Sequence, residues 1–208
     1  MEYLKGHLPL DAQAEQLLDR VLIAGKDELI LRLAAVSYYR LSGYLFPFRE
    51  ADSDNFRPGT ELRVVWDRYC FDRRLRVLLL DAIERVEVAG HFGMPDEQLL
   101  GWLRGLYAAR NICAHHSRIW NRILGYAPGL PQKNKHPEWH LKDEAGKSLI
   151  VGNRTGMVII LCHQFLKLIT PTSCWQQRVN ELFAEYPEIP LTDMGLTADW
   201  QNHPLWKS

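Results

Sequence analysis

The chain has 208 residues, 47% of them hydrophobic, which suits one large domain or one domain with additions. Its 25 Lys and Arg balance 25 Asp and Glu, which argues against a globally basic, indiscriminate polyanion binder. No apolar run reaches about 18 residues, and the N-terminus lacks a signal-peptide pattern, so we expect no membrane segment. Four widely spaced cysteines without a Cys-x-x-Cys pair are typical of reduced thiols in a cytoplasmic protein.

The spacing of apolar residues predicts a series of helices. In chain order, they cover residues 10–22, 26–40, 61–88, 95–123, 155–169 and 172–186. Leu41-Ser42-Gly43 is expected to close the second helix, and Thr60 to cap the third. Pro95 suits the first position of the fourth helix. Thr172 or Ser173 is expected to start the last one.

Two segments lack helical periodicity. Residues 125–153 are rich in Pro, Gly, Lys and Asn, which predicts a long ordered loop. Residues 187–208 predict an irregular tail held to the body by its aromatic side chains. No strand-like alternation occurs, so the expected fold class is all-α. Its expected parts are an N-terminal helical region at 1–60, a helical bundle at 61–186 and a C-terminal tail at 187–208.

Residues 110–122, Arg-Asn-Ile-Cys-Ala-His-His-Ser-Arg-Ile-Trp-Asn-Arg, carry the strongest functional signal. On an ideal helix at about 100° per residue, one arc is polar and the opposite arc is apolar. The polar arc holds Arg110, Asn111, His115, Arg118, Asn121 and Arg122. Arg binds phosphate with a fork of donors, and His titrates near neutral pH. This face could therefore bind a phosphate and transfer a proton.

The surroundings of this motif are locally basic. From Arg104 to Lys142 the sequence has seven Lys and Arg, four His and one acidic residue, Glu138. The stretch after residue 180 is acidic instead. The charge pattern therefore favours one local anion site.

Helical geometry separates the two neighbouring histidines. His115 lies on the polar arc, whereas His116 projects at roughly 240°, among the apolar positions. A packed or hydrogen-bonded structural role is the stronger interpretation of His116, although a distorted helix would bring it into the site. Arg118, Asn121 and Arg122 could bind flanking phosphates or could belong to a solvated helix face.

Three further groups have two interpretations each. Tyr39, Arg40 and Tyr44 could form a patch that stacks bases and binds phosphate, but a helix end packed by aromatic residues is the stronger interpretation. Glu84 and Glu87 could act as paired carboxylates, but ion pairs with arginines such as Arg85 and Arg73 explain them better.

The segment His136-Pro137-Glu138-Trp139-His140 superficially matches a zinc helix. It lacks the His-Glu-x-x-His spacing, and Pro137 and its loop setting argue against metal binding. We therefore expect no metal and no cofactor.

Three blocks of the chain together resemble a known family. They are Tyr38–Tyr44 with Pro47-Phe48-Arg49, Phe71–Arg76 running into Ile83–Val88, and Arg110–Arg122. The closing residues Met194-Gly195, Trp200 and Pro204-Leu205-Trp206 also fit. The chain thus resembles the Abi-like family of bacterial abortive-infection proteins, the AbiD/AbiF group, a branch of the HEPN superfamily.

The sequence departs from that family at one point. Family members carry several dozen residues between the Glu84–Val88 block and the helix of the Arg-Asn motif, whereas here residues 89–95 form the whole connection. Either the chain is a shortened homologue or an internal segment is absent.

The resemblance implies a HEPN-like bundle that cleaves RNA without a metal, often with two motifs brought together in a homodimer. The family signature maps to Arg110, Asn111 and His115, with RNA as the partner. An antitoxin or a small regulatory RNA would be a further partner. The alternative function is a non-catalytic module that binds a small or structured RNA.

Overall fold

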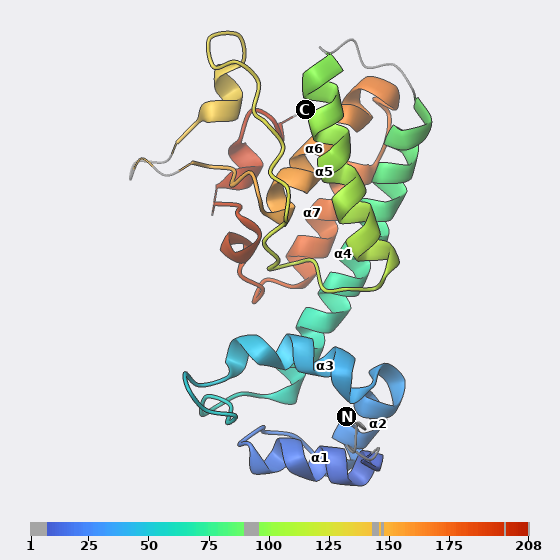
Figure 1. Ribbon diagram of the computed structural model, residues 1–208, viewed down its shortest axis with the longest axis vertical. Coiled ribbons are helices and arrows are strands. Elements are labelled where there is room, and N and C mark those ends of the chain that lie inside the picture. Colours follow the sequence, from blue (N-terminus) through green and yellow to red (C-terminus); the bar gives the residue numbers. More distant parts are fainter. Residues whose placement is uncertain (1–7, 90–95, 143–145, 147, 198, 208) are drawn as a thin grey trace, which may run out of the picture. The chain divides into compact units, whose positions relative to one another are not determined.

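The computed structural model describes residues 8–89, 96–142, 146, 148–197 and 199–207 (Figure 1). Within these residues, regular structure consists of α-helices and short 3₁₀ helices, and β pairing is limited to isolated bridges. The all-α fold class is therefore confirmed. The chain divides into two compact units, Met1–Cys70 and Phe71–Ser208, and helix α4 (Leu62–Ala89) contributes to both. The division at residues 60 and 186 stays a prediction.

The first unit contains α1 (Leu10–Asp19), α2 (Lys26–Val36), α3 (Tyr38–Leu45) and η1 (Phe46–Phe48). They enclose a small apolar core with the first turns of α4. Its buried side chains include Ala14, Leu17, Leu29, Leu33, Leu41, Tyr44, Phe56 and Val65. Two cation–π contacts of 4.2 Å, Arg32 over Trp66 and Arg68 over Phe48, close the rim of this core.

The structure corrects several predicted helix boundaries in this unit. The helix expected at 10–22 ends at Asp19. The helix expected at 26–40 ends at Val36, because Ser37 adopts a φ of 62° and a new helix starts at Tyr38. Leu41-Ser42-Gly43 therefore lies inside α3 and closes nothing. The hydroxyl of Thr60 donates to the carbonyl of Arg57 at 2.6 Å, so this side chain holds the preceding turn.

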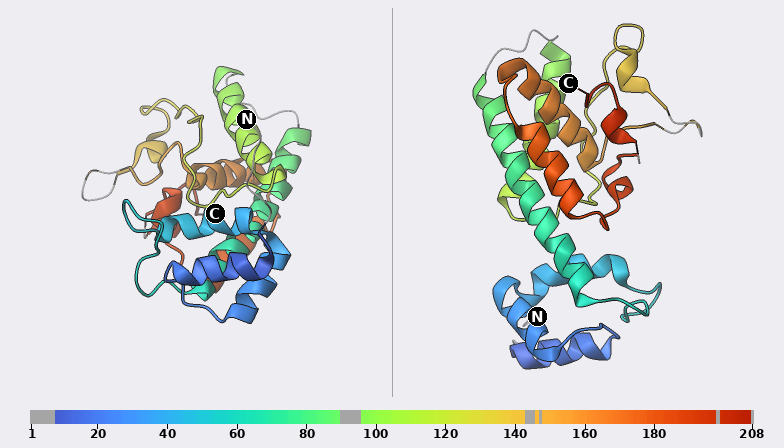
Figure 2. Two further views of the ribbon diagram at one scale, coloured as in Figure 1. Left: turned by 60° about the horizontal axis from the view of Figure 1, so that its bottom comes forward. Right: turned by 180° about the vertical axis from the view of Figure 1, so that it is seen from behind.

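The second unit is a bundle of α4 from residue 71, α5 (Asp96–Ala114), α6 (Thr155–Ile169) and α7 (Trp175–Glu185). Helix α6 is its centre, since every residue from Thr155 to His163 is buried. The indole of Trp175 donates to the carbonyl of Leu78 at 2.8 Å and joins α7 to α4. The views in Figures 1 and 2 agree that α7 runs beside α4.

The long loop after α5 packs against α5 and contains η2 (Pro137–His140). Trp102 donates from its indole to the carbonyl of Gly129 at 2.8 Å. Gly105 allows the loop to come close, because a Cβ there would lie 2.6 Å from Cγ of Pro128. These contacts make the loop an ordered layer on the bundle, as its composition predicts.

The C-terminal tail contains η3 (Leu191–Met194) and η4 (Trp200–Asn202) and is held by aromatic contacts. The ring centroid of Trp206 lies 4.5 Å from that of Trp200 and 4.7 Å from that of His163. Polar side chains of α6 and α7 also donate to three consecutive tail carbonyls, those of Leu205, Trp206 and Lys207. The predicted pinning of the tail is therefore confirmed.

Helix boundaries in this unit are partly as predicted. The helix expected at 155–169 is confirmed, whereas α7 begins at Trp175, later than expected, and the amide of Trp175 donates to Oγ of Ser173 at 3.3 Å. Pro95 and the short connection at 90–95 lie outside the described residues. None of the described helices is long and apolar enough to cross a membrane.

Candidate functional site

Helix α5 ends in the middle of the Arg110–Arg122 motif. The helix was expected to continue to residue 123, but its last residue is Ala114. A hydrogen-bonded turn follows at His115 and His116, and residues 117–119 have no regular structure before a second turn at Trp120 and Asn121. The prediction of one continuous polar helix face is therefore wrong beyond Ala114.

The helix ends in a Schellman motif built on a histidine. The amide of His116 donates to the carbonyl of Cys113, and the amide of Ser117 donates to that of Ile112, both at 3.0 Å. His116 has a φ of 54°, in the left-handed region that glycine usually occupies at this position. His116 is exposed, so it terminates the helix and is not packed among apolar side chains.

The first part of the motif keeps helical geometry. The amide of His115 donates to the carbonyl of Asn111 at 3.0 Å, which continues the helical hydrogen-bond pattern by one residue. Asn111 and His115 therefore stand one turn apart on the same face, with Arg110 beside them. Arg110 and His115 are exposed and Asn111 is half-buried. The three predicted catalytic residues thus share one accessible helix end.

The second part of the motif lies on the loop. Arg118 and Asn121 are half-buried and Arg122 is exposed. The amide of Arg122 donates to the carbonyl of Ile119 at 3.1 Å, which defines a turn. Oδ1 of Asn121 is buried and has no hydrogen-bond partner among the described residues. Their nearness to His115 therefore depends on the path of this loop.

A buried carboxylate on α4 fixes that path. Asp72 has no exposed surface, and its Oδ1 accepts hydrogen bonds from the amides of Ile119 and Trp120, each at 2.8 Å. Arg76, one turn further along α4, forms an ion pair with Oδ2 of Asp72 and donates to the carbonyl of Ser117 at 3.4 Å. The pair therefore satisfies backbone groups that the broken helix leaves unpaired.

Two residues around the start of α6 hold the same loop from the other side. The hydroxyl of Thr155 donates to the carbonyl of Ile119 at 2.6 Å. The guanidinium of Arg154 donates to the carbonyl of Asn121 at 3.3 Å. The side chains of Ile119 and Trp120 are fully buried, so the loop is anchored by both polar and apolar contacts.

Sequence reasoning missed Asp72 and Arg76, although a signal exists. Buried residues of α4 recur at alternating spacings of four and three, at Val65, Tyr69, Asp72, Arg76, Leu79, Ile83 and Val86. Two opposite charges four residues apart thus occupy core positions of an otherwise apolar helix seam. Charges in a core need partners, so this pattern predicts a buried ion pair that binds backbone groups.

Cys113, which lies inside the motif, is buried beneath it. Burial, together with the charge of Asp72, raises the pKa of the Cys113 thiol to about 12. The thiol is therefore protonated at neutral pH and is a poor nucleophile. It serves as a core side chain.

Tyr39 and Arg40 belong to the first unit, on α3. The side chain of Tyr39 is 89% exposed, and Arg40 is exposed as well. Tyr44 is buried instead, with its ring 5.5 Å from that of Tyr69 in an edge-on contact. Tyr44 therefore supports the interpretation of an aromatic-packed helix, whereas RNA binding by Tyr39 and Arg40 stays a prediction.

The remaining candidates do not form a site in the described part of the chain. Arg85 pairs with Asp81 at 2.9 Å, and no described ion pair involves Glu84 or Glu87, so their expected pairing is wrong. Nε2 of His140 lies 2.7 Å from the carbonyl oxygen of Pro131, which indicates a structural role. No cluster of three or more potential metal-binding side chains occurs among the described residues.

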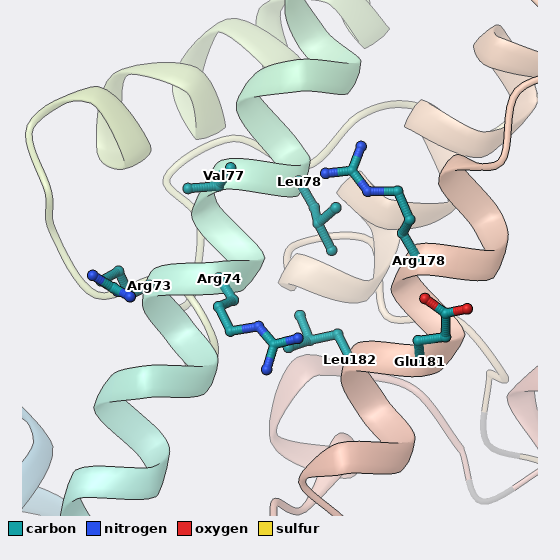
Figure 3. A pocket seen from close by; sticks show the side chains of 7 residues that line it. All are labelled: Arg73, Arg74, Val77, Leu78, Arg178, Glu181 and Leu182. Atoms are coloured by element: carbon teal, nitrogen blue, oxygen red, sulfur yellow. The ribbon is translucent and has the colours of Figure 1, made fainter.

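A hollow of about 440 Å³ between α4 and α7 is lined partly by arginines (Figure 3). Arg74 reaches toward α7 and pairs with Glu185, and Arg178 pairs with Asp81 at 3.3 Å. Arg73 points away from α7 (Figure 3). Two of the three arginines that line this hollow are thus neutralised by neighbouring carboxylates.

Comparison with known proteins supports the resemblance to the Abi-like family. No curated protein and no solved structure matches the chain. A model of the Abi-like protein family matches residues 32–91 and 87–121. The two matched pieces overlap at residues 87–91. The match includes both the Asp72–Arg76 pair and the motif from Arg110 to Asn121, and it supports placing the chain in the Abi-like protein family.

Proposed function

We propose that the protein is a metal-independent endoribonuclease of the HEPN type, acting in the cytoplasm in bacterial abortive infection or in a toxin–antitoxin system. The observation that carries this proposal is the shared, accessible helix end of Arg110, Asn111 and His115. The Abi-like family match supports the role in abortive infection.

The chemistry would use the nucleophile that RNA itself carries. The 2′-hydroxyl attacks the adjacent phosphorus, and the bond to the 5′-oxygen of the next nucleotide breaks. His115 would take the proton from the 2′-hydroxyl or give one to the leaving oxygen. Arg110 would stabilise the charge on the non-bridging oxygens, and Asn111 would orient His115 or donate to an oxygen. The products are a 2′,3′-cyclic phosphate and a 5′-hydroxyl.

One histidine supplies either the base or the acid, whereas the reaction needs both. We propose that a two-fold homodimer provides the second histidine from the partner chain. Sedimentation should then show a dimer at the concentrations where RNA is cleaved. Full activity of a strictly monomeric protein would contradict this arrangement.

The test uses end-labelled RNA incubated with the purified full chain in EDTA. Cleavage with 2′,3′-cyclic phosphate ends is expected, and His115→Ala should abolish it while RNA binding persists. His140→Ala is the matched control, because His140 is bonded to a loop carbonyl away from the motif. Products with 3′-hydroxyl ends and a strict need for Mg²⁺ would overturn the proposal.

The second candidate function is RNA binding without cleavage. The observation that favours it is the single histidine on the helical part of the motif, since phosphate binding needs no acid–base pair. Binding that is lost in Arg110→Ala, without any cleavage by the unmodified protein, would support this function.

A further inference from the structure

The accessible face of α5 extends well beyond the three proposed catalytic residues. At about 100° per residue, an arc of about 140° holds Leu100, Arg104, Tyr107, Arg110, Asn111 and His115. The opposite arc holds the buried side chains of the helix, Trp102, Leu106, Ala109 and Cys113. The first six residues therefore form one outward surface, the α5 face, and the three proposed catalytic residues occupy only one end of it.

Arg104 adds an unneutralised positive charge to the α5 face. The positions three and four residues away, where ion pairs on a helix form, are occupied by Leu100, Gly101, Tyr107 and Ala108. None of the ion pairs in the described part of the chain includes Arg104. Residues 98–137 contain no Asp or Glu at all. The charge of this face is therefore complementary to a polyanion.

An accessible aromatic ring lies between the two arginines of the α5 face. Tyr107 is three residues from Arg104 and three from Arg110, so it lies about one helical turn from each. Its side chain is 60% exposed, so its ring offers a free surface to a ligand. An exposed aromatic ring flanked by cations is the arrangement that binds single-stranded nucleic acids, because bases stack on the ring while the cations bind phosphates.

The spacing along the helix fits a few nucleotides. With a rise of about 1.5 Å per residue, Tyr107 lies about 6 Å and Arg104 about 10 Å from Asn111 along the helix axis. A strand bound at Arg110 and His115 would therefore meet first the ring and then the second cation. In a duplex, the bases stack on each other and offer no face to the ring, so the strand must be unpaired.

The charge of the α5 face also favours RNA over a second copy of the chain as its occupant. A copy packed on this face with two-fold symmetry would bring Arg104 and Arg110 close to the same cations of its partner, which like-charge repulsion disfavours. The proposed homodimer needs only the two helix ends close together. It therefore leaves the preceding turns of the α5 face to RNA.

We propose that Tyr107 and Arg104 extend the nuclease site along unpaired RNA. Tyr107 stacks on one base, and Arg104 binds a phosphate further along the same side of the scissile bond. Both side chains bind the substrate away from the reacting atoms, so they determine its affinity and its position. The inference rests on the proposed function and names single-stranded RNA as its substrate, but binding is measured without cleavage.

The first experiment measures the stacking contribution of Tyr107. Fluorescence anisotropy follows binding of a labelled single-stranded RNA of about ten nucleotides to the full chain carrying His115→Ala, which keeps the RNA intact. In this background, Tyr107→Ala and Tyr107→Leu should each weaken binding about tenfold, whereas Tyr107→Phe should retain the affinity, because only an aromatic ring stacks on a base. Binding of a duplex with the same sequence should not depend on residue 107.

The second experiment measures the phosphate contact of Arg104. In a plot of log K against log salt concentration, Arg104→Ala should reduce the slope by about 0.7, the value for one phosphate contact on a single strand. Arg178→Ala is the matched control, because Asp81 already neutralises this cation, and it should leave the slope unchanged.

The third experiment follows cleavage by the protein with His115 intact. Tyr107→Ala and Arg104→Ala should each raise KM and leave kcat nearly unchanged, because the contacts that they remove are the same in the ground state and the transition state. A fall in kcat with an unchanged KM would contradict substrate binding away from the reacting atoms.

The inference is overturned if Tyr107→Leu binds RNA as tightly as Tyr107→Phe does, or if Arg104→Ala keeps the salt slope of Arg178→Ala. It is also overturned if these variants lose dimerisation in sedimentation while their affinity for RNA stays unchanged, because the α5 face is then a contact between copies. An unmodified protein that binds RNA through Tyr107 and Arg104 but cleaves none of it would support this inference and contradict the nuclease proposal.

Discussion

Asp72 replaces, with one carboxylate, the hydrogen bonds that a continuing helix α5 would have made. In a helix, the amides of Ile119 and Trp120 would donate to carbonyls four residues earlier. Here both donate to Oδ1 of Asp72, and Oδ2 pairs with Arg76. A carboxylate in the core is tolerated because its lone pairs are used by a cation and two backbone donors.

Removing this carboxylate should destabilise the second unit strongly. Asp72→Ala leaves the guanidinium of Arg76 buried without its counter-charge, which typically costs about 3–5 kcal/mol. Urea unfolding should show this loss, and hydrogen exchange should show lost protection at the amides of Ile119 and Trp120. Asp81→Ala, which removes two partly exposed ion pairs, with Arg85 and Arg178, should cost less than about 1 kcal/mol for each pair. Equal effects of the two variants would contradict the role given to Asp72.

We expect His163 to make the free energy of unfolding depend on pH. Burial, with a smaller contribution from Lys167, lowers the pKa of His163 from 6.5 to about 4. Between these two values the unfolded chain binds more protons than the folded chain. The free energy of unfolding should therefore fall as the pH drops from about 6.5 to about 4, by up to about 3 kcal/mol from this residue.

Urea unfolding at several pH values tests this dependence. His163→Gln should flatten the profile between about pH 6.5 and pH 4, because glutamine does not titrate. His203, whose pKa burial also lowers, stays in both proteins and does not affect the difference. His136→Gln, at an exposed site, should leave the profile unchanged. A His163→Gln profile identical to that of the unmodified protein would refute the assignment.

At the scale of elements, periodicity predicts helix interiors better than helix ends. The helices at 61–88 and 155–169 were predictable because their apolar stripes face a core over their whole length. The break at Ser37 was not predictable, since no proline or glycine marks it and a serine rarely adopts a positive φ. The path of the chain after α5 was not predictable either, because a side chain 47 residues earlier, that of Asp72, binds the amide of Ile119.

The candidate site was predictable to the same extent. Arg110, Asn111 and His115 lie where helical spacing places them, because the helix still continues there. Arg118, Asn121 and Arg122 do not share that face, because the chain has already left the helix. Asp72 and Arg76 are not found by a search for apolar stripes, because such a search leaves charged residues out.

The end of α5 itself offers a test. His116 has a φ of 54°, which costs a residue with a Cβ about 1–2 kcal/mol but costs glycine little. His116→Gly should therefore raise the free energy of unfolding by about 1 kcal/mol. The greater conformational entropy of glycine in the unfolded chain reduces this gain. His116→Ala keeps the Cβ and should give no such gain. Chemical denaturation of the three proteins measures the difference.

The same two variants distinguish a structural role of His116 from a role in RNA binding. If His116 serves only to end the helix, His116→Gly should bind RNA with unchanged affinity. A matched loss of affinity in both His116→Gly and His116→Ala would show that the imidazole contacts RNA.

At the scale of the whole molecule, the residues matched by the family model do not coincide with either of the two compact units. The matched residues run from 32 to 121 and so include parts of both units, with α4 as their common element. The bundle after residue 121, with α6, α7 and the tail, lies outside the match. It nevertheless supplies Arg154 and Thr155, which hold the loop of the motif.

Thiol labelling should report how the folded chain protects its interior. Cys174 is exposed, whereas Cys113 and Cys162 are buried, and burial raises the pKa of both buried thiols above the usual range. Iodoacetamide at pH 8 should modify Cys174 within minutes and the buried pair only on global unfolding. Peptide mass spectrometry at increasing urea checks the order. Early labelling of Cys113 would contradict the tight packing under the motif.

The buried ion pair of Asp72 and Arg76 on α4 is as much a part of the motif as residues 110–122 are. A helix that carries Arg110, Asn111 and His115 could be grafted onto another helical bundle, but the following cations would then have no fixed path. A graft of the motif into another protein would therefore need two separate pieces of chain, residues 72–76 and residues 110–122, placed side by side. A recipient scaffold therefore needs an Asp and an Arg four residues apart at core positions of the neighbouring helix, in a place where a designer would otherwise put leucine.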